Sequence, residues 1–333
     1  MSGPRMPTAR DVVQAAERIA GRVHPTRLAH SAELDRALDR PVLLKCENEQ
    51  YGGAFKARGA CNAVLAADPS RIRAGVATHS SGNHAAALAH AARLAGIPAT
   101  VVMPRNAARV KREAAEAAGA RVVSCAPTQQ AREATLEAVV AESGAAVIHP
   151  YADPDVIAGQ GTVGLELLDE LRDGDTVVVP LGGGGLISGI SLLLADRAPG
   201  VRVIGVEPAG ADDGLRSFRA GRVVPVTPDT IADGLRATIG ALNLEIIRRH
   251  VADIVTVPDA AILEALGQVE QYHKMPLEPS GVVGVAAVAT GAIAGRGRVL
   301  IVITGGNHDP ATSDPGSSPG PGSGAPRGPG VVQ

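Results

Sequence analysis

The stretch VVVPLGGGGLISGISLLLAD, residues 177–196, decides the fold prediction, because an apolar β-branched run passes through four glycines into an apolar helical run. Four consecutive glycines lose much backbone entropy on folding, which disfavours an ordinary flexible turn. Free N–H groups at a helix start form a phosphate cradle. The dinucleotide spacing G-x-G-x-x-G fails at Ile187 and Ser188, and no Gly-Lys-Ser/Thr follows as in a P-loop. We therefore predict a monophosphate site at Gly182, Gly183, Gly184 and Gly185.

The same strand-like pattern recurs along the chain. Apolar runs alternate with helical patterns and cover residues 41–47, 75–80, 99–104, 121–125, 145–150, 176–181, 201–208, 253–258 and 298–306. This alternation predicts an α/β fold of open parallel sheets that helices cover on both faces.

The spacing of these runs also predicts the domains. Residues 75–150 hold four short strand–helix units and form a predicted small domain. It is inserted into a large domain made of residues 1–65 and 151–309. Residues 310–333 are rich in Pro and Gly, so we predict a disordered tail there.

Composition excludes several classes of partner. The net charge is −2 and only 2% of residues are aromatic, which argues against nucleic acid and anionic membranes as partners. No apolar run reaches the roughly 18–20 residues that span a bilayer.

The N-terminus predicts an amphipathic helix capped by Thr8, not a signal peptide. Three cysteines without metal-like spacing indicate reduced thiols, so we expect a cytoplasmic protein.

Lys56 stands out in GGAFKARGACN (residues 52–62), since only four of the 32 basic residues are lysines. A lysine amine can form an imine with an aldehyde, whereas a guanidinium cannot usefully do so. Taken alone, Lys56 is more simply explained as a solvated surface lysine. A phosphate cradle elsewhere in the chain changes that judgement, because pyridoxal 5′-phosphate carries both an aldehyde and a phosphate.

A second polar loop lies in THSSGNHAAALAHAA, residues 78–92. A lone Ser or Asn at a helix start is usually an N-cap. The cluster of Ser80, Ser81, Asn83 and His84 exceeds what a cap needs. We therefore expect this loop to offer donors to a carboxylate.

Four motifs in order, ENEQYGGAFKARGACNAV, SSGNHAAALA, VPLGGGGLISGI and ITGGN, resemble those of fold-type II pyridoxal-phosphate enzymes. These have the tryptophan synthase β-subunit-like fold, with the cofactor in the cleft between two lobes. Within them the chain is similar to the serine/threonine dehydratase and serine racemase branch over about residues 10–309. The resemblance implies that the site residues have these roles: Lys56 holds the cofactor as an imine, Phe55 packs at its ring, Asn83 bonds its phenolic oxygen, Gly182, Gly183, Gly184 and Gly185 hold the phosphate, and Thr304 meets the pyridine nitrogen.

The stretch GVEPAGADDGLRSFRAG, residues 205–221, resembles members of this branch that bind a divalent cation. The resemblance places Glu207, the carbonyl of Ala211 and Asp213 as ligands of Mg²⁺ or Ca²⁺, which both prefer oxygen. From spacing alone, a solvated acidic loop is the simpler explanation. Two departures from the family concern the pocket: Gly52 and Ala54 stand where a hydroxyl residue is frequent, and Tyr151 stands where asparagine is common.

The implied activity is β-elimination from a small β-hydroxy amino acid such as threonine, serine or 3-hydroxyaspartate, giving a 2-oxo acid and ammonia. Lys56 would remove the Cα proton, while Ser80, Ser81 and His84 would hold the substrate carboxylate. One alternative is an amino-acid racemase that uses Lys56 and Ser81 on opposite faces of Cα. Another is a pyridoxal-phosphate-binding protein without activity. Relatives suggest a homodimer.

Overall fold

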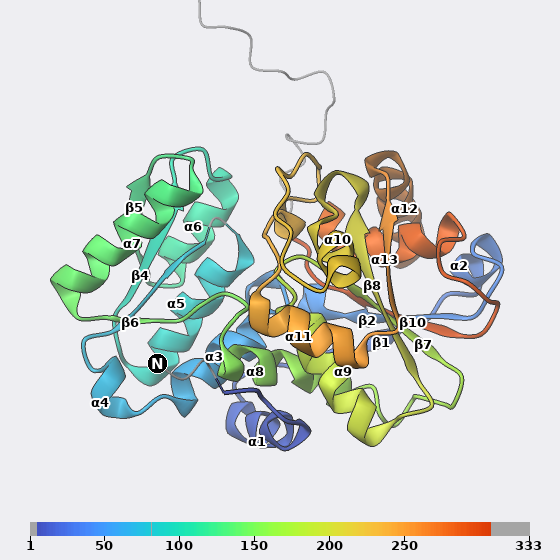
Figure 1. Ribbon diagram of the computed structural model, residues 1–333, viewed down its shortest axis with the longest axis horizontal. Coiled ribbons are helices and arrows are strands. Elements are labelled where there is room, and N and C mark those ends of the chain that lie inside the picture. Colours follow the sequence, from blue (N-terminus) through green and yellow to red (C-terminus); the bar gives the residue numbers. More distant parts are fainter. Residues whose placement is uncertain (1–4, 81, 308–333) are drawn as a thin grey trace, which may run out of the picture.

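The chain contains two β-sheets in separate lobes (Figure 1), as seen in a computed structural model that describes residues 5–80 and 82–307. The large sheet has the strand order β1-β2-β10-β7-β8-β9, and the small sheet has the order β5-β4-β3-β6. Every strand pair is parallel except β1 with β2, which is antiparallel. The predicted α/β fold of parallel sheets is therefore confirmed. The predicted tail, residues 310–333, lies outside the described residues.

The strands lie where the apolar runs predicted them, with one addition. β1 (Leu28–Ala29) is too short to leave a periodic signal in the sequence. The large sheet continues with β2 (Val42–Cys46), β7 (Thr176–Pro180), β8 (Arg202–Pro208), β9 (Asp253–Val257) and β10 (Val299–Ile303). The small sheet consists of β3 (Val76–His79), β4 (Ala99–Pro104), β5 (Arg121–Cys125) and β6 (Ala146–Val147).

Helices connect the strands and cover the faces of both sheets. The α-helices are α1 (Ala9–Ile19), α2 (Ala32–Ala37), α3 (Lys56–Ala66), α4 (Pro69–Ile72), α5 (Asn83–Ala95), α6 (Arg109–Ala117), α7 (Gln129–Ser143), α8 (Pro154–Leu165), α9 (Gly185–Arg197), α10 (Asp213–Ala220), α11 (Ala241–His250), α12 (Asp259–His273) and α13 (Pro279–Ala289). Short 3₁₀ turns are η1 (Glu47–Glu49), η2 (Tyr51–Gly53), η3 (Ala209–Ala211) and η4 (Asp233–Leu235). None of the described helices is long and apolar enough to cross a membrane.

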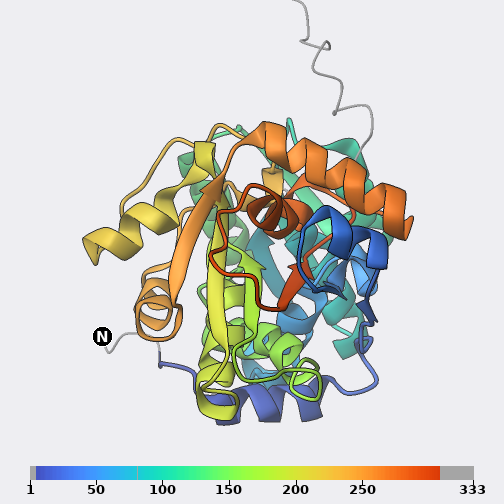
Figure 2. The same ribbon diagram turned by 90° about the vertical axis from the view of Figure 1, so that its right-hand side faces the viewer.

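The large sheet is buried on both faces, because its side chains alternate between two helical layers. Val178 of β7 packs in one core with α12 and α13, while Val177 and Val179 pack in another with α9 and α11. Figure 2 shows the sheet between α12 on one side and α9 on the other. Thr8 caps α1 as predicted, and its side chain accepts a hydrogen bond from the N–H of Asp11 in a capping box.

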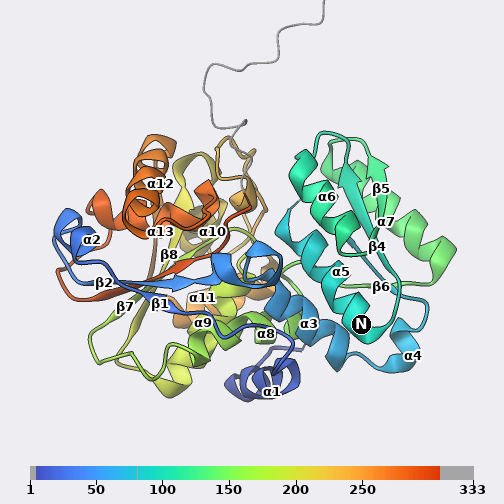
Figure 3. The same cartoon turned by 180° about the vertical axis from the view of Figure 1, so that it is seen from behind.

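Glycines let α3, α8 and α9 pack with their backbones close together. A Cβ added to Gly159 of α8 would lie 2.7 Å from Cα of Gly59 in α3. A Cβ added to Gly189 of α9 would lie 2.3 Å from the carbonyl oxygen of Ile157 in α8. These three helices lie side by side above α1 at the base of the molecule (Figure 3). The packing fixes the start of α3, which carries Lys56, relative to the start of α9, which carries the glycine loop.

Candidate active site

The carboxyl ends of the parallel strands gather the predicted site residues. Lys56 opens α3 shortly after β2, the loop of Ser80 follows β3, the four glycines follow β7, and Thr304 follows β10. β2 and β10 are neighbours, and the N–H of Phe55 donates to the carbonyl of Thr304 at 3.2 Å. Ligands in open α/β folds bind at this edge of a sheet.

The Lys56 amine is buried, and burial favours its neutral form. Its Nζ donates a hydrogen bond to the carbonyl of Pro150 at 3.0 Å and lies 4.9 Å from the centre of the Phe55 ring. Burial lowers the pKa of Lys56 to about 8, and the charge of Glu278 partly opposes that shift. The amine is therefore a better nucleophile and base near neutral pH than an ordinary lysine.

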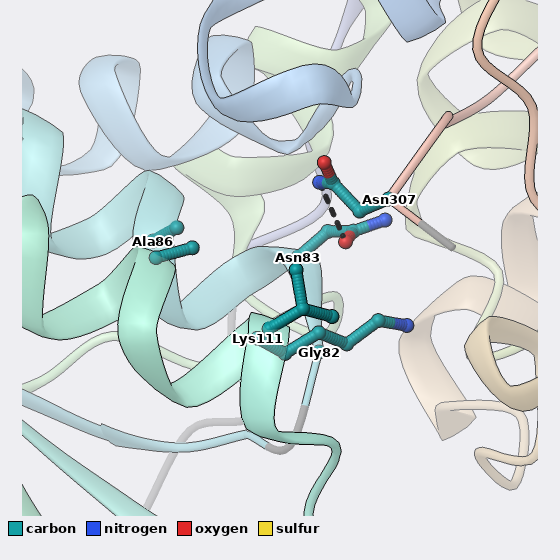
Figure 4. A pocket seen from close by; sticks show the side chains of 7 residues that line it. Gly82, Asn83, Ala86, Lys111 and Asn307 are labelled. Atoms are coloured by element: carbon teal, nitrogen blue, oxygen red, sulfur yellow. Dashed lines mark hydrogen bonds between the residues drawn. The ribbon is translucent and has the colours of Figure 1, made fainter. Parts of the chain in front are cut away.

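The polar loop after β3 leads into α5, whose first residue is Asn83. Ser80 Oγ accepts a hydrogen bond from the N–H of Gly82 at 3.2 Å, and Ser81 lies outside the described residues. Asn83 Nδ2 donates to Glu278 Oε1 at 2.9 Å. Asn83 Oδ1 accepts from Asn307 Nδ2 at 3.1 Å (Figure 4). Both ends of the Asn83 amide thus have partners within the protein.

His84 is buried one residue further along α5. Its Nε2 lies 3.4 Å from the carbonyl oxygen of Ile148, and no partner for Nδ1 is found among the described residues. Burial, reinforced by the charge of Lys56, lowers the pKa of His84 to about 3. The imidazole is neutral at physiological pH, so it can only donate or accept a hydrogen bond there.

The glycine loop fits a phosphate group. Gly182, Gly183, Gly184 and Gly185 are buried, and no side chain caps the N-terminus of α9 that follows them. A buried helix start without partners for its N–H groups requires an anion or another acceptor. Gly184 adopts a φ of +91°, which favours glycine. A Cβ on Gly183 would lie 2.4 Å from Cγ of Tyr151, so that position also requires glycine.

Tyr151 fills the space beside the glycine loop. Its ring contacts Gly183 and packs edge-on against His149, with the ring centres 4.5 Å apart. Tyr151 and Ala152 donate their backbone N–H groups to Nδ1 of His149 at 3.3 and 2.9 Å. The departure from asparagine at this position therefore places a large ring against the candidate phosphate site.

Thr304 offers a neutral hydroxyl at the end of β10. The side chain is buried, and its Oγ1 donates to the carbonyl of Ser280 at 3.4 Å. A carboxylate at this position would keep a nearby pyridine nitrogen protonated, whereas a hydroxyl has no charge with which to do so.

Glu207 and Asp213 form a buried pair of carboxylates. The two oxygens of Glu207 accept the N–H groups of Gly214 at 2.9 Å and Leu215 at 2.8 Å, and Asp213 Oδ2 accepts that of Ile239 at 2.7 Å. Burial raises the pKa of Glu207 to about 8 and that of Asp213 to about 6. Ala211 is buried beside them in η3. Burial makes it costly to ionise these two carboxylates without a nearby positive charge. A bound cation would supply that charge, so the pair fits a cation site.

The described residues show no group of three or more His, Cys, Asp and Glu side chains suited to a metal ion. A cation at this site would therefore rely on the two carboxylates and on carbonyl oxygens. That ligand set suits Mg²⁺ or Ca²⁺ better than a transition metal.

Three residues contribute to the site although our prediction assigned them no role. Glu278 precedes α13, is only 2% exposed, and donates its N–H to the carbonyl of Gly305 at 3.1 Å. Lys111 of α6 and Asn307 lie beside Asn83 in the same pocket (Figure 4). A signal existed for Glu278: it is the lone charged residue between Lys274 and Arg296, just before an apolar helix.

Comparisons with known proteins indicate the family and the fold that the chain is similar to. The family model described as "Pyridoxal-phosphate dependent enzyme" matches residues 19–305. The chain is 43% identical to beta-hydroxyaspartate dehydratase of Paracoccus denitrificans, over 91% of this chain and 97% of that protein. It is also 43% identical to serine racemase of Arabidopsis thaliana, over 90% of this chain and 92% of that protein. The solved structure of maize serine racemase superimposes with a TM-score of 0.89 at 40% identity, covering 92% and 96% of the two chains. A solved threonine deaminase (from T.th.) gives 0.86 at 41% identity, covering 91% and 99%.

Proposed function

Because the chain belongs to the pyridoxal-phosphate dependent enzymes, we propose that it eliminates the β-hydroxyl of a small β-hydroxy amino acid. The products are a 2-oxo acid and ammonia. The candidate substrates are 3-hydroxyaspartate, threonine and serine, and the first two fit the dehydratase and deaminase names of similar proteins. The observation that carries the proposal is a lysine amine with a lowered pKa that bonds the carbonyl of Pro150, while the next residue, Tyr151, packs against the uncapped, glycine-lined helix start.

Different residues of the site are proposed to bind different parts of the cofactor. Lys56 would carry it through its amine, the glycine loop would bind its phosphate, and Asn83 and Thr304 would contact its ring. When bound, pyridoxal phosphate supplies an electron-withdrawing ring that takes up the electrons left when Cα loses its proton. The neutral hydroxyl of Thr304 moderates that withdrawal, which favours elimination over transamination.

Lys56 is also the proposed base. The substrate amine would first replace the Lys56 amine on the cofactor. The Lys56 amine released in this way, with a pKa of about 8, would be partly neutral at physiological pH and could accept the Cα proton. The β-hydroxyl would take up the proton held by Lys56 and leave as water. The remaining enamine would tautomerise and be hydrolysed to ammonia and the 2-oxo acid. Ser80, Ser81 and the neutral His84 are proposed to orient the substrate carboxylate through hydrogen bonds.

A racemase is the second candidate, supported by the equal identity to a plant serine racemase. Racemisation requires a proton donor on the face of Cα opposite Lys56, and Ser81 is the proposed donor. Ser81→Ala should then lower D-isomer production by roughly 10²–10⁴-fold while elimination of the L-isomer continues. Equal losses for both reactions would mean that Ser81 only positions the substrate.

The cation and the assembly are further parts of the proposal. Glu207, the carbonyl of Ala211 and Asp213 would bind Mg²⁺ or Ca²⁺, supported by their buried carboxylates. A homodimer is proposed from the resemblance to the family. A cytoplasmic location is proposed because the three cysteines are buried and free.

A substrate panel tests the central reaction. Purified holoenzyme is incubated with L-threonine, L-serine and the isomers of 3-hydroxyaspartate, and 2-oxo acid and ammonia are measured together with chiral analysis of the remaining amino acid. Equal amounts of 2-oxo acid and ammonia from at least one substrate are expected. Stereochemical inversion without formation of a 2-oxo acid would favour the racemase. If the enzyme converts none of these substrates, both candidate functions are contradicted.

A further inference from the structure

Glu278 lies where the two lobes meet and faces two residues of the small lobe. It comes from the large lobe, at the N-cap of α13. Its Oε1 accepts the hydrogen bond from Asn83 Nδ2 at 2.9 Å, and Oε2 lies 3.9 Å from Lys111 Nζ. No hydrogen-bond partner for Oε2 occurs in the part of the chain that the structure describes. This carboxylate plays no part in the proposed reaction.

The hydrogen bonds of Asn83 allow one orientation of its amide. Nδ2 donates one hydrogen to Glu278, and Oδ1 accepts from Asn307 Nδ2, which also donates to the carbonyl of Gly52 at 2.5 Å. Turning the amide over would set its oxygen against the carboxylate and its NH₂ against that of Asn307. The second hydrogen of Nδ2 therefore remains for a ligand, always from the same side of the side chain.

Lys111 links this arrangement to the contact between the lobes. It extends from α6 of the small lobe toward the large lobe (Figure 4), where its Nζ lies 2.5 Å from Asp233 Oδ2. Lys111 is only 6% exposed, so water screens its charge weakly. If the lobes separate, Glu278 loses the nearby cation and Asn83 loses its acceptor together.

We infer that Glu278 is a positioning residue, which fixes the Asn83 amide for the cofactor ring and makes that orientation depend on the Lys111 contact between the lobes. The inference rests on the proposed contact between Asn83 and the ring oxygen. It assigns Glu278 no contact with the substrate. One carboxylate then both fixes the orientation of the Asn83 amide and takes part in the contact between the lobes.

The charges around Glu278 determine how this arrangement depends on pH. Burial raises the pKa of Glu278 to about 7, Lys111 opposes the shift, and Asp233 reinforces it. Hydrogen bonds from Asn83 and from the backbone N–H of Asn307 also favour the ionised form, and Lys56 is the further cation whose charge interacts with it. Removing the charge of Lys111 should therefore raise the pH at which Glu278 ionises.

The test uses holoenzyme and reads the visible absorption of bound cofactor from pH 5.5 to 9, with cofactor affinity measured separately. Glu278→Gln should remove a spectral transition near pH 7 and weaken cofactor binding about 10-fold, the effect of losing about 1.4 kcal/mol. Lys111→Met should move that transition upward while the lobes still bind cofactor. Arg109→Met, which removes an exposed charge from the same helix, is the matched control and should leave the spectrum unchanged.

Three outcomes would overturn the inference. Unchanged affinity and spectrum in Glu278→Gln would show that Glu278 does not act on Asn83, and an unshifted transition in Lys111→Met would remove the link to the lobe contact. If Glu278→Gln fails to fold, Asn83→Ala and Lys111→Met form a second arm. Their effects on cofactor affinity should be less than additive if one network holds both, and simple additivity would contradict it. These measurements follow cofactor affinity and absorption, not turnover. The proposed elimination reaction is tested separately by the substrate panel, and a failure there would contradict the proposed function alone.

Discussion

Replacing Arg58 with methionine should destabilise the protein by about 3–5 kcal/mol, because it breaks a buried ion-pair network beneath Lys56. Arg58 is 1% exposed and lies two residues after Lys56 in α3. Its guanidinium donates to both oxygens of Glu47 at 2.7 and 2.8 Å and to those of Glu166 at 2.5 and 3.0 Å. Lys45 Nζ completes the network at 2.5 Å from Glu166.

The magnitude follows from the charges that remain. Two cations balance two carboxylates in the native network, whereas Arg58→Met leaves one cation for two. Lys45 bonds Glu166, so Glu47, which is 0% exposed, becomes a buried charge without a cation. The hydrogen bond from Thr26 Oγ1 at 2.5 Å remains but carries no charge. Losing one partner of a buried pair costs about 3–5 kcal/mol, a large part of the roughly 5–15 kcal/mol that stabilises a typical domain.

The assay is denaturant unfolding of cofactor-free protein, followed by circular dichroism. Arg109→Met is the control, since Arg109 and Glu113 form an exposed i,i+4 pair worth about 0.3–0.5 kcal/mol. Adding Glu47→Gln to Arg58→Met should recover more than about 1 kcal/mol, because it removes the stranded charge. A loss below about 1 kcal/mol for Arg58→Met, or no recovery in the double variant, would refute the charge-balance reasoning.

Two further predictions concern the glycine loop and the carboxylate pair. Gly183→Ala should weaken cofactor binding by roughly 5–150-fold, equivalent to about 1–3 kcal/mol of overpacking. Adding Tyr151→Ala should restore much of the affinity, since the new Cβ clashes with that ring. Equal binding by Gly183→Ala and the parent, measured by cofactor titration, would contradict this account of the close contact. The raised pKa values of Glu207 and Asp213 mean that the folded, cation-free protein binds more protons than the unfolded chain, so its stability should fall as pH rises from about 4 to about 8. Added Mg²⁺ or Ca²⁺ should stabilise the protein increasingly over that range, and Glu207→Ala should abolish the increase. Equal melting temperatures with and without the cation at pH 8 would contradict cation binding by this buried pair.

Local patterns in the sequence were sufficient for every strand except β1, for the Thr8 cap of α1 and for the glycine loop before α9. Val177, Val178 and Val179 alternate between two apolar cores, and such β-branched runs mark strands wherever both faces are buried. The strand β1 escaped prediction because two residues carry no periodicity. The glycine loop was recognisable because close packing and a positive φ leave no alternative residue.

Contacts between distant residues could not be predicted in this way. Glu278, Asn83 and Lys111 lie on separate elements, and their meeting depends on how the two lobes close. Similarly, Arg58 and Glu166 are 108 positions apart, so no local pattern reports their ion pair. The buried charge of Glu278 was visible in the sequence only as one acidic residue in an apolar stretch, which does not identify its partners.

The most direct test of the account is the identity of the lysine that carries the cofactor. Purified holoenzyme is reduced with borohydride, digested, and mapped by mass spectrometry. The account predicts that the cofactor label lies on Lys56, and that Lys56→Arg abolishes both the label and 2-oxo acid formation while the protein remains folded. Label on Lys45, Lys111 or Lys274, or full activity of Lys56→Arg, would contradict it.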